Sequence, residues 1–337
     1  MIYEDTSSLC SEPLLSAFIF TYNQQELVKN TIESFLSQQC DFEYEIVICD
    51  DCSKDNTLKV CLEYQMQYPD LIRVVENDNN LGIRGNYITN VGKYARGKYV
   101  ATCAGDDWWS DKKKLQKQVS FLVANPRYSL VHSYAAIYID SKKKYSKRLL
   151  GSNRNSFEEN ILCNGVAALT ICFTKKSFDE FVLEVNPLSL PFSEDYPMVI
   201  WFSYRKQIYF MNEVLCTYRL LTNSLSHSTD LSLTYKRTKE VLECQLLFIN
   251  MFNYQNQDII NKVYLASYVD TIRMATLLDD KQQIAKACSF FKEHHYRLFY
   301  LLSRCYRFAG TNTLMNELVF MIERILRRVH PYRKFYL

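Results

Sequence analysis

Two apolar runs that end in polar residues decide the fold: LLSAFIF at 14–20, followed by TYN at 21–23, and YEIVIC at 44–49, followed by DD at 50–51. Continuous apolar runs of this length are typical of strands buried on both faces of a parallel sheet. Between the two runs, residues 26–39 have the apolar spacing of an amphipathic helix. The beginning of the chain therefore predicts a strand–helix–strand unit.

The same alternation continues along the chain. Strands are expected at 71–75 and 99–103, and helices from about residue 57 and at 84–94. Repeated alternation of strands and helices predicts a doubly wound, mostly parallel sheet flanked by helices. Ligands bind at the carboxyl ends of the strands in such sheets.

Acidic pairs stand at two of these strand ends. Asp50 and Asp51 follow the second strand, and Asp106 and Asp107 follow the fourth. Helix capping by the acids is the alternative interpretation. Helix capping explains one pair well but both pairs together less well, because two tryptophans rather than a helix directly follow Asp107. A Rossmann dehydrogenase is not indicated, since no Gly-x-Gly-x-x-Gly follows the first strand.

The second half of the chain predicts further elements and then a change of pattern. From about residue 231 the pattern is helical, so we predict an α/β domain at 1–230 and a helical subdomain at 231–337. The elements expected before the boundary are a helix at 112–124, a strand at 130–138, a polar loop or hairpin at 141–159, a strand at 166–174, helices at 175–184 and 198–204, and strands at 208–210 and 214–219. Those expected after it include helices at 231–254, 258–278 and 313–328.

The amino-acid composition argues against one class of main partner and indicates in which compartment the protein is expected. The net charge is +3, from 40 basic and 37 acidic residues, which is too balanced to indicate nucleic acid as the main partner. Twelve scattered cysteines and a start without a basic and apolar leader predict reduced thiols in the cytoplasm. Cys49 and Cys52 are not expected to be a redox pair, because the aspartates between them would raise a thiol pKa. No apolar run reaches the roughly 18 residues of a membrane span.

Several short motifs, taken in order, resemble the family 2 glycosyltransferases, which have the GT-A fold. The motifs are FIFTYN (18–23), DDCSKDNT (50–57), NLG (80–82) with Asn86, ARGKYV (95–100), GDDWW (105–109), KLQKQ (114–118), EDYP (194–197) and YR (218–219). The resemblance covers about two thirds of the chain. It implies metal-dependent transfer of a sugar, with inversion, from a nucleoside-diphosphate sugar, UDP-sugar above all, to a hydroxyl of a glycan or lipid-linked acceptor in surface-polysaccharide synthesis.

The resemblance also assigns the donor site. It implies that Asp51 accepts a hydrogen bond from the nucleotide base and that Thr21 and Asn23 line the same pocket. Asp106 and Asp107 would carry Mn²⁺ or Mg²⁺, whose preferred ligands are carboxylate and phosphate oxygens. The usual acid two residues before Asp106 is replaced by Ala104.

The remaining assignments concern the reacting groups. Asp195 matches the catalytic base, with Glu194 as the rival candidate. Trp108 or Trp109 is expected against a sugar face, the other in the core. Arg219 is expected to contact the diphosphate.

A segment at 222–227 after Arg219 is a possible lid. Leu221 stands where relatives have a histidine, which leaves His227 as a weak substitute.

Two other functions fit part of the pattern. A nucleotide-sugar-binding module without turnover is suggested by Ala104 alone. A nucleotidyltransferase also needs strand-end carboxylates and a metal ion, but the Gly- and basic-rich phosphate loop is missing. The basic, amphipathic helix at 313–328 predicts either packing on the catalytic domain or contact with the inner face of an anionic membrane.

Overall fold

The computed structural model describes residues 1–190, 195–221, 230–310 and 312–329, with the backbone alone at 323–329. The chain divides into two compact units. One comprises residues 1–160 and 164–222, and the other comprises residues 161–163 and 223–337. Each unit is described by itself.

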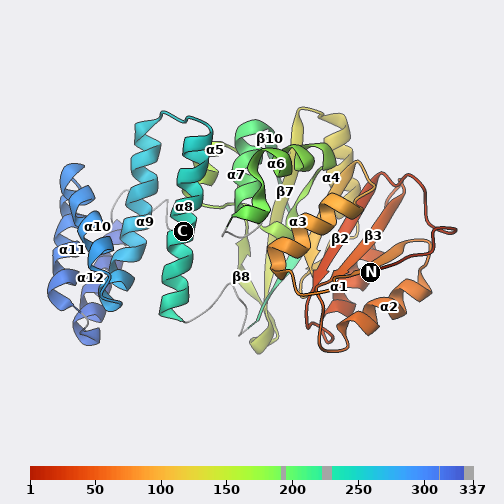
Figure 1. Cartoon of the computed structure of the whole chain (residues 1–337), viewed down its shortest axis with the longest axis horizontal. Coiled ribbons are helices and arrows are strands. Elements are labelled where there is room, and N and C mark those ends of the chain that lie inside the picture. The colour runs from red at the N-terminus through yellow and green to blue at the C-terminus, as the bar shows by residue number, and fades with distance from the viewer. Residues whose placement is uncertain (191–194, 222–229, 311, 330–337) are drawn as a thin grey trace. The chain divides into compact units, whose positions relative to one another are not determined.

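The first unit is built on one mixed sheet flanked by helices (Figure 1). Within the described residues the sheet has ten strands in the order β1-β4-β3-β2-β5-β9-β7-β10-β6, with β8 paired to β7. Neighbours are parallel in the pairs β2–β3, β2–β5, β3–β4 and β7–β10 and antiparallel elsewhere. The strands are β1 (Ile2–Tyr3), β2 (Leu15–Thr21), β3 (Tyr44–Asp50), β4 (Ile72–Glu76), β5 (Tyr99–Ala104), β6 (Trp108–Trp109), β7 (Tyr128–Ile139), β8 (Lys144–Leu150), β9 (Cys172–Thr174) and β10 (Gln207–Leu220).

The helices of this unit connect the strands. They are α1 (Val28–Leu36), α2 (Thr57–Gln67), α3 (Gly82–Tyr94), α4 (Lys114–Ala124), α5 (Phe157–Leu162), whose last residues are assigned to the other unit, α6 (Lys175–Val185) and α7 (Asp195–Arg205). The predicted fold class, a mostly parallel sheet flanked by helices with a helical C-terminal region, is confirmed.

Two expectations for the second half of the sheet need correction, and one open alternative is decided. The strands predicted at 208–210 and 214–219 are one strand, β10, in which Asn212 and Glu213 bulge out between the pairs Met211–Ser133 and Val214–Tyr134. The strand predicted at 166–174 is shortened to β9, because residues Ala168–Thr170 form a 3-10 turn. Of the two alternatives for 141–159, the hairpin holds, since β8 pairs antiparallel with β7.

Apolar packing fixes the position of the first strands. Every residue of β2 is buried, and α1 covers the sheet through Val28, Ile32 and Phe35. At the turn into β5, a Cβ on Gly97 would lie 2.5 Å from the backbone nitrogen of Ser16. Only glycine therefore allows this turn to lie directly against β2.

The second unit consists of helices. They are α8 (Leu231–Met251), α9 (Gln257–Leu277), α10 (Lys281–Glu293), α11 (Arg297–Ala309) and α12 (Thr313–Val329), drawn in cyan to blue in Figure 1. Their shared core includes Tyr268, Phe291 and Tyr306. None of the helices in the described part of the chain has the length and hydropathy needed to cross a membrane.

Candidate active site

The carboxyl ends of β2, β3 and β5 lie side by side and bring the two acidic pairs together. Thr21, the last residue of β2, is in register with Asp50 of β3, and its carbonyl accepts a hydrogen bond from the Asp51 N–H at 3.0 Å. On the other side of β2, the Gly105 N–H donates to the Phe20 carbonyl at 2.8 Å. One strand thus separates the pair after β3 from the pair after β5.

Asp51 is buried at this edge, with 3% of its surface exposed. Its Oδ1 accepts hydrogen bonds from the Leu81 N–H at 2.9 Å and from the Asn77 amide at 2.8 Å. The helix-cap alternative is wrong for Asp51, because Asp55 accepts the hydrogen bond from Thr57 N–H at the start of α2. The carboxylate is held on one oxygen by the segment that precedes α3.

Thr21 and Asn23 shape the same region from the end of β2. The Thr21 hydroxyl donates to the Gln24 side-chain carbonyl at 2.9 Å. Asn23 has a left-handed φ of 51°, and its Oδ1 accepts a hydrogen bond from the Lys54 N–H at 2.7 Å. The Asn23 N–H donates to the Ser53 hydroxyl at 2.9 Å. Asn23 therefore fixes the loop after β3, a role that its place in the motif did not indicate.

Asp106 and Asp107 are adjacent carboxylates, of which the first is half-buried and the second buried. Asp107 is buried, and its Oδ1 accepts the Arg219 N–H at 2.8 Å. Burial, together with the negative charge of Asp106, raises the pKa of the Asp107 carboxyl well above its usual range. Burial also raises the pKa of Asp106. Ionising both Asp106 and Asp107 is therefore unfavourable in the folded protein without a bound cation.

Arg219 links this acidic pair to Asp140, which follows β7. Its Nε donates to the Asp106 carbonyl oxygen at 2.9 Å, and its Nη1 donates to Asp140 Oδ1 at 3.0 Å. The guanidinium carbon lies 4.8 Å from the centre of the Trp108 ring. In this structure Arg219 positions the acidic loop. Asp140 was missed from the sequence, because it stands after a strand without a recognisable motif.

The two tryptophans of β6 have different environments. Trp109 is buried and stacks on Phe35, with ring centres 3.5 Å apart. The buried Lys114 ammonium lies 4.2 Å from the centre of the Trp109 ring on β6. Trp108 is half-buried and contacts Tyr138 as well as Arg219. Trp109 thus belongs to the core, and Trp108 is the tryptophan beside the acidic loop.

Asp195 is the first residue of α7 and is half-buried. One turn further along, the Met198 sulfur lies 4.0 Å from the Tyr87 hydroxyl, and the Tyr87 ring packs on Phe20 with centres 4.8 Å apart. This series of contacts links the first turns of α7 to the carboxyl end of β2. Glu194, Phe192, His227 and the segment 222–227 lie outside the described residues.

The acidic pair suits a divalent cation that also binds a phosphate-bearing ligand. Within the described ranges, no group of three histidine, cysteine or acidic side chains is placed to hold a metal ion. Asp106 and Asp107 would therefore supply two carboxylates at most. Mg²⁺ is commonly held in proteins by one or two carboxylates together with substrate phosphates and water. The two carboxylates fit such an ion when a phosphate-bearing ligand supplies further oxygens.

Comparison with known proteins extends these observations. In solved structures, the fold resembles that of S. aureus TarS 1-349 in complex with UDP-GlcNAc, with a TM-score of 0.54 and 15% identity over 88% of this chain and 90% of that one. It also resembles the mannosyltransferase PcManGT from Pyrobaculum calidifontis in complex with GDP-Man and Mn2+, with a TM-score of 0.54 and 14% identity over 92% of this chain and 86% of that one. At these identities the likeness concerns the fold.

Similar sequences occur in several bacteria. The uncharacterized protein Rv1520 of Mycobacterium tuberculosis is 29% identical over 217 residues, which is 64% of this chain and 61% of that relative. The Escherichia coli protein WfgD, named a UDP-Glc:alpha-D-GlcNAc-diphosphoundecaprenol beta-1,3-glucosyltransferase, is 25% identical over 57% of this chain and 70% of the relative. The match therefore spans about three fifths of the length of the mycobacterial relative.

A family model supplies the assignment. The model for glycosyl transferase family 2 matches residues 16–184, half of the chain, and includes both acidic pairs. The sheet order, the carboxylates at neighbouring strand ends and this match agree with one another. The chain belongs to glycosyl transferase family 2.

Proposed function

We propose that this chain transfers a sugar from a nucleoside-diphosphate sugar, a UDP-sugar in the first instance, to a hydroxyl group of a saccharide acceptor, with inversion at the anomeric carbon. Residues 1–230 would carry this activity. The observation that supports the proposal most directly is the meeting of Asp51, Asp106 and Asp107 at one edge of the sheet. These acids fit the base and the diphosphate of one donor molecule.

Binding of the donor divides between the two acidic pairs. Asp51 has one oxygen engaged by Leu81 and Asn77, and its other oxygen is suited to accept a hydrogen bond from the uracil N3–H. Asp106 and Asp107 would hold Mn²⁺ or Mg²⁺, which stabilises the negative charge that develops on the leaving diphosphate. Trp108, the half-buried tryptophan beside Asp107, is placed to pack against the sugar or ribose.

Asp195 is proposed as the general base. Its carboxylate takes the proton of the acceptor hydroxyl while that oxygen attacks the anomeric carbon, and the bond from this carbon to the diphosphate oxygen breaks. Attack from the opposite face inverts the configuration in a single displacement. No covalent sugar–enzyme intermediate is formed, so a second carboxylate acting as nucleophile is not required.

Calorimetric titration with UDP tests the donor site. We expect UDP to bind the wild-type protein in the presence of Mn²⁺, to bind more weakly without it, and to lose the metal-dependent part in Asp106→Asn. Asp70→Asn, at an exposed aspartate, is the matched control and should bind as the wild type does. Absence of binding by UDP, GDP and dTDP would overturn the proposal.

The product released separates this activity from its rivals. A glycosyltransferase releases UDP from a UDP-sugar when acceptor is present, whereas a nucleotidyltransferase forms or consumes pyrophosphate. A binding module without turnover would bind UDP-sugar and release neither. Ala104 is the feature that favours this last alternative, and the complete set Asp51, Asp106, Asp107 and Asp195 weighs against it.

We also propose that the second unit contacts an anionic membrane surface, where a lipid-linked acceptor would be found. α11 contains Arg297, Arg304 and Arg307 and no acidic residue. Phe308 of α11 and Leu314 of α12 are 85% and 81% exposed, respectively. Exposed apolar side chains beside arginines are typical of helices that lie on anionic lipid. WfgD, whose name specifies a diphosphoundecaprenol-linked acceptor, supports the same location.

Sedimentation with lipid vesicles tests this contact. We expect co-sedimentation with phosphatidylglycerol vesicles, little with phosphatidylcholine vesicles, and a loss in the double variant Phe308→Ser/Leu314→Ser. Leu183→Ser is the control, because Leu183 is an equally exposed leucine (87%) in the first unit. Equal sedimentation of both variants would overturn the proposal, as would concentration-dependent dimers that depend on Phe308 and form without lipid.

A further inference from the structure

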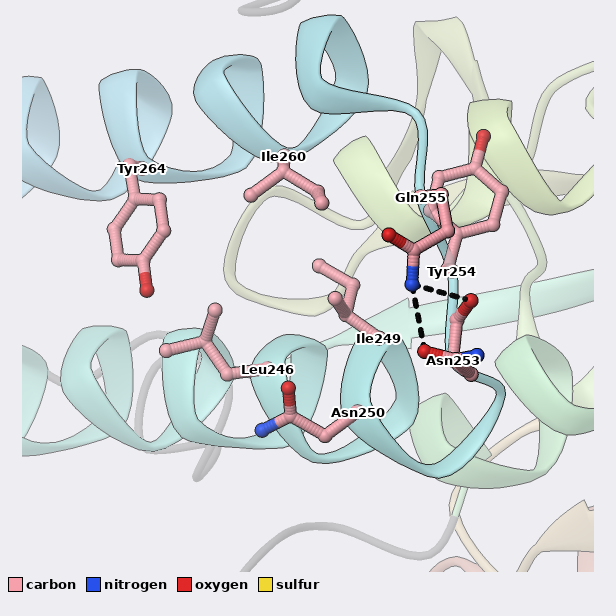
Figure 2. A pocket seen from close by; sticks show the side chains of 8 residues that line it. All are labelled: Leu246, Ile249, Asn250, Asn253, Tyr254, Gln255, Ile260 and Tyr264. Atoms are coloured by element: carbon pink, nitrogen blue, oxygen red, sulfur yellow. Dashed lines mark hydrogen bonds between the residues drawn. The ribbon is translucent and has the colours of Figure 1, made fainter.

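A pocket of about 290 Å³ lies within the second unit, between α8 and α9. Figure 2 shows Leu246, Ile249 and Asn250 extending from α8 toward Ile260 and Tyr264 of α9. The turn that joins the helices closes one end. All of these elements belong to residues 223–337, so the pocket is formed by this unit alone.

The pocket combines an apolar floor with a neutral polar rim. Leu246, Ile249 and Ile260 supply aliphatic surface. The amides of Asn250, Asn253 and Gln255 and the ring and hydroxyl of Tyr264 supply the polar groups. None of the lining side chains is charged. Such a lining disfavours phosphate, nucleotides and acidic peptides, because no cationic side chain lines the pocket, and the Asn256 side chain already accepts hydrogen bonds from the first N–H groups of α9.

The polar groups of the turn are held in place before any ligand binds. Asn253 has a left-handed φ of 47°, and the Gln255 amide nitrogen donates to its Oδ1 at 2.6 Å and to its carbonyl at 3.1 Å. These bonds fix both amides and leave the Gln255 carbonyl oxygen, which points toward Ile260, for a ligand, whereas the Asn253 N–H₂ points away from the other lining side chains (Figure 2). An ordered set of neutral donors and acceptors loses little entropy when it binds a ligand.

Amides above an aliphatic and aromatic surface match the chemistry of a sugar ring. Its hydroxyl groups both donate and accept hydrogen bonds, and its C–H faces pack on apolar side chains. The volume is near the lower limit of the roughly 300–1,000 Å³ usual for ligand pockets. One sugar ring fits this volume better than a complete nucleotide sugar.

We propose that the pocket between α8 and α9 binds a neutral sugar unit of the acceptor or product glycan, separately from the donor site. This inference rests on the proposed function, because the transferase activity supplies the reason for a saccharide to be present. A second point of attachment would hold a growing glycan on the protein between transfers, since two linked weak contacts bind more tightly than either alone.

Saturation-transfer NMR with the methyl glycosides of glucose, galactose and N-acetylglucosamine tests the proposal. We expect at least one glycoside to receive saturation from the wild-type protein without nucleotide. Asn250→Leu should weaken the signal at least about threefold, as expected for a lost hydrogen-bonding amide. Ile260→Trp, which fills the pocket, should abolish it. Gln282→Leu is the control, because Gln282 is an exposed amide on the neighbouring helix α10.

The outcomes distinguish this inference from the proposed function. Absence of transfer to all three glycosides, in a protein that binds UDP, would overturn the inference and leave the transferase intact. Equal signals in Asn250→Leu, Ile260→Trp and Gln282→Leu would also overturn it, since the sugar would then bind elsewhere. Signals that fall in both pocket variants, in a protein whose UDP binding is unchanged by the substitutions, would support it.

Discussion

The two edges of the parallel sheet both bury carboxylates but treat them in opposite ways. At the amino edge, Glu45 is almost completely buried, and its Oε2 lies 3.0 Å from Arg73 Nη1 and 2.8 Å from Arg96 Nε. Its other oxygen accepts a hydrogen bond from the Ser16 hydroxyl at 2.6 Å. Two cations and a hydroxyl group therefore surround this carboxylate, and one of the cations, Arg73, also pairs with Glu4 at 2.6 Å.

At the carboxyl edge, Asp106 and Asp107 lie beside each other, and fewer positively charged groups offset their negative charges. The guanidinium of Arg219 reaches the carbonyl of Asp106 and the carboxylate of Asp140. Among the residues that the structure describes, the Asp107 carboxylate accepts a hydrogen bond from the backbone N–H of Arg219 and from no guanidinium N–H. Removing a fully paired buried acid is costly because its partners lose their counter-charge, whereas incompletely paired acids with perturbed pKa values are more often found at binding sites. We therefore expect substitutions at the amino edge to change mainly the stability of the protein, and substitutions at the carboxyl edge to change mainly the proposed binding of the donor.

The largest expected effect is on catalysis, through the proposed base near the carboxyl edge. Asp195→Asn should reduce turnover roughly 10²- to 10⁴-fold, because the amide cannot take the acceptor proton. The Asn carbonyl can still accept the Tyr196 N–H, so the melting temperature should stay unchanged. Release of UDP from the UDP-sugar in the presence of acceptor measures the effect. Full activity of the variant would remove Asp195 from the mechanism.

Next in size is a loss of stability at the amino edge. Glu45→Ala should lower the free energy of unfolding by about 3–5 kcal/mol, because Arg73 and Arg96 lose a buried counter-charge. Urea unfolding measures the change. Glu63→Ala, at an exposed glutamate, is the control and should change stability little. A loss below about 1 kcal/mol for Glu45→Ala would show that this network is not a stabilising one.

At the carboxyl edge, removing a carboxylate should raise the stability of the folded protein instead of lowering it. The raised pKa of Asp107 means that its ionised form destabilises the folded state above that pKa, and that this penalty disappears as the pH falls to the usual value of 3.8. Without divalent cations, Asp107→Asn should therefore raise the melting temperature at pH 8, by about 2–4 °C per kcal/mol relieved. The difference from the wild type should vanish near pH 4. Thermal unfolding between pH 4 and pH 8 measures the difference. A lower melting temperature of Asp107→Asn than of the wild type at pH 8 would show that the ionised Asp107 does not destabilise the fold.

The smallest expected effect is the loss of stability in Arg96→Gln, which tests which arginine is the main partner of Glu45. The Arg96 side chain is 31% exposed, whereas that of Arg73 is 6% exposed. Arg96→Gln should therefore cost less than about 1 kcal/mol in urea unfolding, because Glu45 keeps its bonds to Arg73 and Ser16. A cost similar to that of Glu45→Ala would mean that Arg96, despite its exposure, is the main partner.

Local sequence pattern predicted the parallel half of the fold well. The apolar runs that became β2 and β3 specify buried strands by themselves, and the acids after them mark the strand ends. The donor-site predictions Asp51, Asp106 and Asp107 come together for this reason. Their individual roles, like that of Asp195, stay predictions.

The remainder depends on contacts between distant segments. β6 consists of Trp108 and Trp109 and exists only because β10 pairs with it. The two-residue bulge at Asn212 and Glu213 looked like the end of a strand, because polar residues interrupt the apolar run. Asp140 and the loop-fixing role of Asn23 have no local signature, since each depends on a partner from another part of the chain.

The hydrogen bond between Asp107 and Arg219 has a consequence for the order of assembly. It joins residues 112 positions apart, and the second of them lies beyond residue 184, where the family match ends. At about 5–20 residues per second of synthesis, Arg219 emerges roughly 6–22 s after Asp107. During that interval β2 to β5 can already pair on the growing chain, and Thr31 can bond to the Gly105 and Asp107 carbonyls, while the bonds from Arg219 are still missing. The nascent protein would therefore pair β2 to β5 before the bond between Asp107 and Arg219 at the proposed donor site can form.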